Sequence, residues 1–369
     1  MRTSDLANYK RALLDCEDAL NRVNLHEEEG YTVRFAIFSA NLTNFLPEIP
    51  QSEHAELFKS LLTNLAFESF ERNLLQIGDF CDVKGNIKSL KSNKTPQIFC
   101  TFHLGSYRII ANLLIRMGHN FSTIVRQDVY SKQIESMMSY TARMKEKYDT
   151  NSEVSVLNAE DPQILLKLVR ELKSGRSLLV YLDGNTGTGD EKLDPVDFLS
   201  QKINARKGMT YLSYITGVPL VPVVSYRKPD RTNMLYAGEA IKAEPGTSRE
   251  EFSTKTLQFL FDFFAKYVAS YPEQWEGWNY IHNALISRED SLQSPPNSAY
   301  KRVHYEFNFS RYSIFELQDA PVLFDKILYS TYEISDGLKN YLLKPPFVNP
   351  KQALGKFIFK ELVRQGILI

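Results

Sequence analysis

This sequence of 369 residues has few cysteines. It has no excess of positive or negative charge and no long apolar run. The three cysteines, Cys16, Cys81 and Cys100, form no CxxC pair or Cys/His cluster, so neither a disulfide framework nor a zinc site is suggested. Lys plus Arg and Asp plus Glu both number 44, whereas a nucleic-acid-binding domain is normally strongly basic. No window approaches the roughly 18–20 consecutive apolar residues of a membrane span, and no signal-peptide core is present. We therefore expect a cytoplasmic protein with no nucleic-acid partner and at most peripheral membrane contact.

The composition is that of an ordinary globular protein, because 43% of the residues are hydrophobic and 24% are charged. Apolar side chains recur at helical spacing through residues 1–92, for example in "DLANYKRALLDCEDALNRV". A helical N-terminal region is therefore predicted there.

After residue 92, short apolar runs alternate with amphipathic stretches. Strands are expected at residues 97–102, 121–126, 152–158 and 177–183, with helices between them. This alternation predicts an α/β core over residues 93–286, with a largely parallel sheet flanked by helices. Ligands of such sheets bind beyond the carboxyl ends of the strands, and His103 and Asp183 both follow predicted strands.

The last part of the chain is set apart by a polar, proline-bearing stretch at residues 287–302, which is predicted to be a linker. Residues 303–369 have an apolar periodicity of their own. They predict a small, mainly helical module, for which a winged-helix-like fold is one option.

The segment "FCTFHLGSYRII" (99–110) places His103 between an apolar strand and a glycine that precedes a helix. An imidazole at such a sheet rim lies beside helix N-terminal amides and is the commonest general base in enzymes. The alternative is a histidine packed against the helix. None of the other histidines has metal-ligand spacing, so no metal site is expected.

The block "HLGSYR" (103–108) resembles the His-x-Gly-(Asn/Ser)-aromatic-(Glu/Asp) block of the late acyltransferases of lipid A biosynthesis, within the lysophospholipid acyltransferase superfamily. Other segments are similar to that family in the same order. They are "NLTNFLPEIP", "IVRQDVYSKQIESMMSYTARMK", "LLVYLDGN", "VDFLSQKINARKGMTYLSYITGVPLVPVVSYR" and "YPEQWEGW". Together the resemblance covers about residues 1 to 285.

The resemblance implies transfer of an acyl group from a phosphopantetheine thioester to a hydroxyl or amine. Acyl-CoA or acyl carrier protein would be the co-substrate, and no tightly bound cofactor is expected. His103 takes the role of general base, and Gly105 and Ser106 of the same block are expected at the substrate. The residues that match basic positions near the donor or acceptor head groups are Arg126, Arg206 and Lys207, for which solvated surface charge is the alternative.

Arg108 departs from the family's pattern, which has a carboxylate at this position. A guanidinium there disfavours the imidazolium and lowers the pKa of His103. Three interpretations are open: another acid orients His103, with Asp183 as first candidate; Arg108 binds phosphate or the thioester-derived oxyanion; or the fold is reused for binding an acyl or carrier-protein ligand. Asp183 is alternatively a turn-forming residue at its strand end. A further alternative within the enzyme class is a thioesterase, in which water replaces the acceptor.

The C-terminal segment "FNFSRYSIFELQDAPVLFDKILYSTYEISDGL" resembles the small winged-helix-like peptide-chaperone domains of pyrroloquinoline quinone biosynthesis. This resemblance implies a peptide or carrier-bound acceptor in a specialised biosynthetic pathway. The alternative is a helical cap that packs on the catalytic domain or mediates dimerisation.

Overall fold

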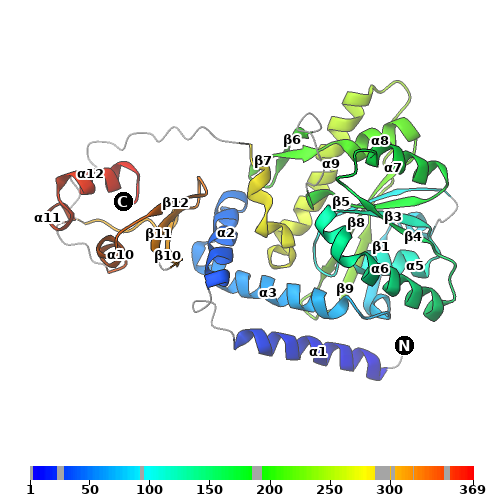
Figure 1. The fold of residues 1–369 in the computed structure, drawn as a ribbon, viewed down its shortest axis with the longest axis horizontal. Helices are drawn as coiled ribbons and strands as arrows, with labels where there is room; N and C mark the ends of the chain where they lie inside the picture. Colours follow the sequence, from blue (N-terminus) through cyan, green and yellow to red (C-terminus); the bar gives the residue numbers. More distant parts are fainter. Residues whose placement is uncertain are drawn as a thin grey trace. The chain divides into compact units, whose positions relative to one another are not determined.

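The computed structural model describes residues 3–22, 29–91, 95–184, 193–286, 300, 304–318, 320–344 and 350–369 (Figure 1). The chain divides into two compact units. The first comprises Met1–Arg22 and Lys59–Ile286, and the second comprises Val23–Phe58 and Ser287–Ile369. Most of the predicted linker, 287–302, lies outside the described residues.

The expected helical N-terminal region is confirmed. Its long helices are α1 (Thr3–Asn21), α2 (Glu29–Phe45) and α3 (His54–Glu71). The same region also holds a short strand, β1 (Cys81–Gly85), between the turn η2 (Ile77–Phe80) and the short helix α4 (Ile87–Lys91). β1 pairs in parallel with a strand some 150 positions further along the chain, a long-range contact that local periodicity does not reveal.

The predicted α/β core is also confirmed. Seven strands form one sheet in the order β1-β9-β8-β2-β5-β3-β4. The six beyond β1 are β2 (Ile98–Thr101), β3 (Phe121–Val125), β4 (Val154–Asn158), β5 (Ser177–Tyr181), β8 (Leu220–Arg227) and β9 (Asn233–Ala237). All neighbouring pairs are parallel except β8 and β9.

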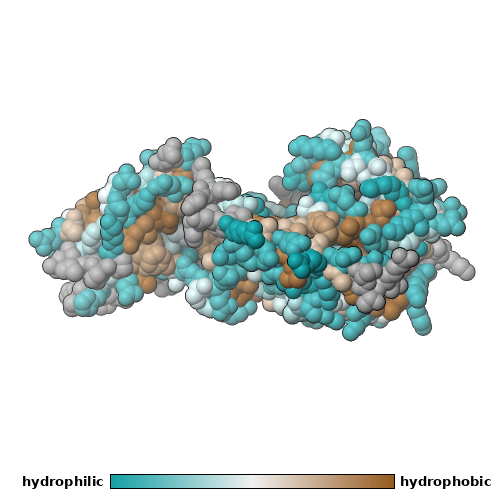
Figure 2. Space-filling view, turned by 90° about the horizontal axis from the view of Figure 1, so that it is seen from below, coloured by the Kyte–Doolittle hydropathy of each residue, from teal (hydrophilic) through white to brown (hydrophobic). Residues whose placement is uncertain are grey.

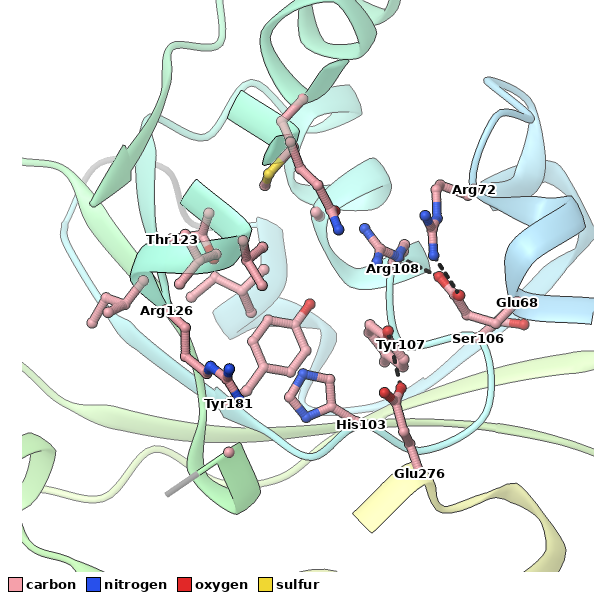
Figure 3. A pocket seen from close by; sticks show the side chains of 18 of the residues that line it. Glu68, Arg72, His103, Ser106, Tyr107, Arg108, Thr123, Arg126, Tyr181 and Glu276 are labelled. Atoms are coloured by element: carbon pink, nitrogen blue, oxygen red, sulfur yellow. Dashed lines mark hydrogen bonds and ion pairs between the residues drawn. The ribbon is translucent and has the colours of Figure 1, made fainter. Parts of the chain in front are cut away.

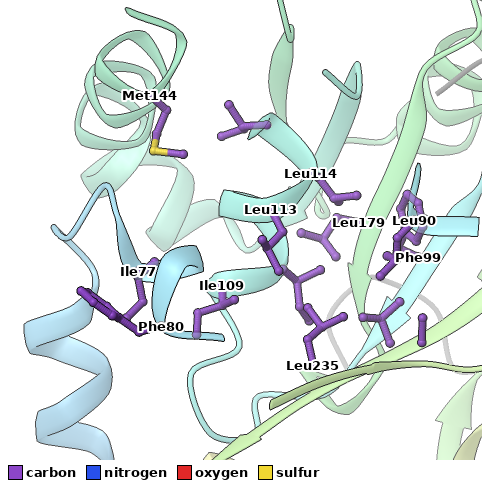
Figure 4. Close-up of a cluster of buried hydrophobic side chains, with 14 of the residues drawn as sticks. Ile77, Phe80, Leu90, Phe99, Ile109, Leu113, Leu114, Met144, Leu179 and Leu235 are labelled. Carbon is purple, nitrogen blue, oxygen red and sulfur yellow. The ribbon is translucent and has the colours of Figure 1, made fainter. Parts of the chain in front are cut away.

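Helices cover both faces of the sheet, which explains why its central strands are apolar throughout. These helices are α5 (Ile109–Arg116), α6 (Gln127–Tyr148), α7 (Ile164–Lys173), α8 (Gly208–Thr216) and α9 (Arg249–Ser270). Successive strand residues point to opposite faces. Phe99 and Leu179 accordingly join the cluster with α5 and α6 (Figure 4), while Cys100 and Leu178 join the one with α7, α8 and α9.

A hairpin of β6 (Leu193–Phe198) and β7 (Gln201–Arg206) lies between β5 and β8 in the chain. The described part of the first unit contains further single-turn 3₁₀ helices, one after β5 and three after α9. They are η3 (Leu182–Gly184), η5 (Pro272–Gln274), η6 (Glu276–Asn279) and η7 (Ile281–Ala284).

The small C-terminal module is confirmed, and it begins with an antiparallel sheet that the sequence did not lead us to expect. The strands are β10 (Tyr312–Leu317), β11 (Ala320–Asp325) and β12 (Ser330–Glu333), followed by α10 (Asp336–Leu342), α11 (Pro350–Leu354) and α12 (Lys356–Arg364). Within the second unit, Phe324 of β11 packs with Ala36 and Ala40 of α2.

No helix in the described part of the chain combines the length and apolar character needed to cross a bilayer. On the face shown in Figure 2, hydrophobic residues form separate patches among hydrophilic ones.

Candidate active site

A cavity of about 1140 Å³ opens in the first unit at the carboxyl ends of the central strands. Its walls come from α3, the segment after β2, α5, α6, η3 and the turns that follow α9 (Figure 3). The predicted site residues that line it are His103, Ser106, Arg108, Arg126 and Asp183. Gly105, Arg206 and Lys207 do not line it.

His103 and Asp183 meet because of the strand register. Thr101 of β2 pairs with Tyr181 of β5 in a parallel ladder, and His103 and Asp183 each follow two residues later. Nδ1 of His103 lies 2.9 Å from Oδ1 of Asp183. The side chain of Asp183 is 1% exposed and that of His103 is 24% exposed, so the imidazole reaches the cavity while its partner is buried beneath it.

The carboxylate of Asp183 is held in place by two further donors. Its Oδ2 accepts hydrogen bonds from the backbone N–H of His103 at 2.9 Å and from the indole N–H of Trp275 at 2.8 Å. The Nδ1–H tautomer of His103 satisfies Oδ1, which leaves the lone pair on Nε2. No hydrogen bond joins Nε2 to another of the described residues, so this nitrogen is available as a base.

The surroundings of His103 favour its protonated form. Burial alone lowers its pKa, but the charge and hydrogen bond of Asp183, with the charge of Glu276, outweigh burial and raise the pKa above the ordinary value. The charge of Arg108 acts in the opposite direction. The imidazole is confined by Tyr181, stacked at 4.4 Å between ring centroids, and by the edge-on ring of Tyr107 at 4.9 Å.

The segment after α9 fixes the loop that carries His103. The carbonyl of Gln274 accepts from the N–H of Gly105 at 2.9 Å, and the N–H of Glu276 donates to the carbonyl of His103 at 3.0 Å. Gly105 has φ +55, and a Cβ there would lie 2.9 Å from the Cα of Tyr226. Gly105 therefore shapes the loop through its backbone.

Arg108 forms an ion pair with a residue that the sequence analysis missed. Its Nε donates to Glu68 of α3, and Glu68 also lies 3.4 Å from Arg72. The guanidinium of Arg108 flanks the ring of Tyr107 at 5.5 Å. Figure 3 shows Arg108, Glu68 and Arg72 together on one side of the cavity. Glu68 carries no sequence signal of its own, because it belongs to a helix 35 positions before His103.

Ser106 belongs to a buried ion-pair network. Its hydroxyl donates to Glu71 and accepts from Nη2 of Arg227 at 2.5 Å. Arg227 and Glu71 lie 2.9 Å apart, with side chains 3% and 4% exposed. The Ser106 hydroxyl thus ties the start of α5 to α3 and β8.

The other predicted basic residues differ in position. Arg126 lies at the cavity edge, where it is 58% exposed and makes two 3.0 Å hydrogen bonds to Asp128. Lys207 precedes α8 and pairs with Asp194 of β6 at 2.7 Å, and Arg206 ends β7. The structure does not bring Arg206 and Lys207 together with His103.

Much of the cavity wall is apolar. It is lined by Ile109, Ile115, Phe121, Ile124, Val129, Met137, Val154 and Leu179. A base with an oriented lone pair thus stands beside a hydrocarbon-lined compartment, an arrangement suited to removing a proton while an apolar chain is bound. The described residues contain no group of three or more His, Cys, Asp or Glu able to hold a metal ion.

Residues 34–285, more than half of the chain, match the sequence model of a family described as bacterial lipid A biosynthesis acyltransferase. No curated protein matches the sequence. A solved structure that resembles the chain is the 1-acyl-sn-glycerophosphate (LPA) acyltransferase PlsC from Thermotoga maritima. Its sequence is 15% identical, the match covers 64% of this chain and 95% of that chain, and the TM-score is 0.34.

Proposed function

The chain belongs to the bacterial lipid A biosynthesis acyltransferase family and is an acyltransferase, and we propose that His103 is its general base and a phosphopantetheine thioester its acyl donor. The donor is acyl-CoA or acyl carrier protein, and the acceptor is a hydroxyl or an amine. The observation that carries this proposal is the contact of Nδ1 of His103 with Oδ1 of Asp183 at 2.9 Å, at the wall of the cavity.

The reaction follows from that contact. Nε2 of His103 takes a proton from the acceptor as the acceptor oxygen or nitrogen attacks the thioester carbonyl. Asp183 stabilises the imidazolium that forms, because its carboxylate lies against Nδ1. When the C–S bond breaks, the imidazolium returns the proton to the leaving thiolate, so the base is regenerated.

Of the three interpretations of Arg108, we favour the one in which Asp183 replaces the missing family carboxylate. Asp183 contacts the imidazole directly, whereas Arg108 is engaged by Glu68. The apolar part of the cavity is the compartment that we assign to the acyl chain, since burial of each methylene contributes about 0.8 kcal/mol.

A peptide or carrier-bound acceptor is the partner that we propose for the C-terminal module. Strand β12 pairs with β11 along one side only and is an edge of its sheet. Its Tyr332 is 48% exposed, and Phe357 of α12 is 84% exposed. Edge strands can bind extended peptides through their backbone groups, which supports an acceptor delivered by its peptide portion.

The test measures thiol release from a panel of acyl-CoA and acyl-carrier-protein donors by native protein, His103→Ala and Asp183→Asn. We expect His103→Ala to lower turnover by about 10²–10⁴-fold. Asp183→Asn should lower turnover and move the acid limb of the pH profile to lower pH, because it removes the charge that raises the pKa of His103. His304→Ala, an exposed histidine of the second unit, is the matched control and should keep full activity.

Mass spectrometry of the products distinguishes an acyltransferase from a thioesterase and from a binding protein. Transfer to added hydroxyl, amine or peptide acceptors supports the proposal, whereas free fatty acid alone would identify a thioesterase. Tight donor binding without turnover would replace the acyltransferase mechanism by a binding role. Turnover that survives in His103→Ala would remove His103 from the mechanism.

A further inference from the structure

The carboxylates on the wall of the cavity are Glu68, Glu71, Asp128, Asp183 and Glu276. The first three are paired with arginines, and Asp183 holds His103. Glu276 differs, because no Lys, Arg or His elsewhere in the described chain forms an ion pair with it. Among the described residues, its side chain accepts one hydrogen bond, from the hydroxyl of Tyr107 at 3.3 Å.

Glu276 lies next to the proposed base. Its backbone N–H donates to the carbonyl of His103 at 3.0 Å, which fixes it beside the loop after β2. Figure 3 shows the Glu276 carboxylate close to Tyr107 and on the His103 side of the cavity. Its negative charge also raises the pKa of Tyr107 and of Tyr280, after the larger effect of their burial.

The cavity therefore offers an acceptor one carboxylate that pairs with no cation of the described residues, while the arginines of its wall are each bonded to another carboxylate. Arg108 and Arg72 both pair with Glu68, and Arg126 pairs with Asp128. A carboxylate partly removed from water is stabilised by a cation that brings its own charge and hydrogen-bond donors. An ammonium group supplies three such donors, whereas Glu276 would repel a phosphate placed against it, and an alcohol would leave the charge of Glu276 unbalanced.

We propose that the acceptor of the reaction is a primary amine, which enters the cavity as an ammonium ion bound by Glu276. This inference rests on the function proposed above, and it selects the amine from the two classes of acceptor given there. The ammonium loses two protons in all: one is released to solvent, and one passes through Nε2 of His103 to the leaving sulfur. The nitrogen forms a C–N bond to the acyl carbon as the C–S bond breaks, so the products are an amide, a thiol and one proton.

The test offers n-hexylamine and 1-hexanol together to the native protein and to Glu276→Gln, with the donor that is consumed in the thiol-release assay. Native protein should form the amide. Glu276→Gln should raise the KM for hexylamine by about tenfold, the scale expected for losing a charged hydrogen-bond partner, with the KM for the donor unchanged. Glu273→Gln is the matched control, because Glu273 lies on the same segment but does not line the cavity.

An ester as the main native product, or an amide-to-ester ratio that Glu276→Gln leaves unchanged, would overturn the amine acceptor. Because an effect of Glu276 on the pKa of His103 changes both products alike, the ratio separates ammonium binding from that effect. Calorimetric titration of hexylammonium into both proteins provides a second measurement. Equal affinity, or no binding to native protein, would also overturn the inference. Donor turnover that depends on His103 but yields ester would leave the proposed function standing.

Discussion

Position 108 holds a guanidinium where the family pattern has a carboxylate, and the chain compensates with side chains that are distant in sequence. Asp183 supplies the negative charge at Nδ1 of His103, and Glu68 pairs with Arg108. The remaining effect of Arg108 on His103 is electrostatic, because its charge lowers the pKa that Asp183 raises. Arg108 therefore keeps more of the imidazole in its basic, neutral form near neutral pH.

Replacing Arg108 by Gln should raise the pKa of His103, since the lowering charge is removed while Asp183 and Glu276 remain. A base must be unprotonated to act, so the acid limb of kcat/KM should move to higher pH. The plateau at high pH should be kept. The measurement is a pH profile of thiol release, with Arg170→Gln on the exposed face of α7 as a control of equal charge change.

A lower plateau with an unmoved acid limb would contradict this account of Arg108. It would instead place the guanidinium on the phosphate or the oxyanion, which was the second interpretation of the sequence.

At the scale of elements, the loop from β2 to α5 is held in one conformation by the segment from Gln274 to Glu276. The N–H of Gly105 donates to the carbonyl of Gln274, and the carbonyl of His103 accepts from the N–H of Glu276. Gly105 occupies a left-handed conformation against β8. The position of His103 thus depends on backbone geometry at Gly105.

Gly105→Ala should lower both stability and activity. A left-handed alanine costs roughly 1–2 kcal/mol, and the added Cβ would meet Tyr226 at 2.9 Å, so the total loss should reach about 2–4 kcal/mol. Gly217→Ala is the matched control, because Gly217 has φ +70 with nothing within 4 Å of an added Cβ. Thermal unfolding should show a larger loss of stability for Gly105→Ala than for Gly217→Ala, and thiol release should show a larger loss of activity. Equal losses in the two variants would mean that contact with β8 is unimportant.

The elements that the sequence predicted are those whose pattern is local. The central strands are buried on both faces and therefore read as continuous apolar runs, which β2 and β5 illustrate. β1 was missed because it is short and half-exposed, and pairs with the distant β9. The hairpin strand β7 does carry a signal, since its alternate residues are buried, but its polar composition concealed it.

The same distinction holds for the site. His103 and Asp183 could be predicted because residues that end neighbouring parallel strands meet at one sheet edge. Their pairing depends on the register of β2 with β5, which the sequence alone does not give. Glu68 and Glu276 come from a helix and a 3₁₀ turn far away in the chain, so no spacing rule connects them with His103.

At the scale of the whole molecule, the second unit is assembled from two distant parts of the sequence. Helix α2 overlaps the residues that match the family, yet it packs with the C-terminal sheet through the Phe324 cluster. Tyr329 adds polar contacts, because its hydroxyl donates to Asn41 at 2.7 Å and accepts from Asn44 at 3.1 Å. Within the second unit, the module is thus joined to α2 by apolar packing and by hydrogen bonds.

Tyr329→Phe should therefore loosen α2 and the C-terminal sheet together. Loss of these buried hydrogen bonds should reduce the local stability of the second unit by about 1–2 kcal/mol. Hydrogen exchange of the full-length protein measures this: backbone amides of α2 and of β10–β12 should exchange faster, while those of β2 and α5 in the first unit keep their rates. Tyr332→Phe, a half-exposed position on β12, is the matched control and should leave all rates unchanged. Faster exchange confined to the strands, with α2 unaffected, would mean that the helix is stable without the module, and that the two parts do not unfold as one.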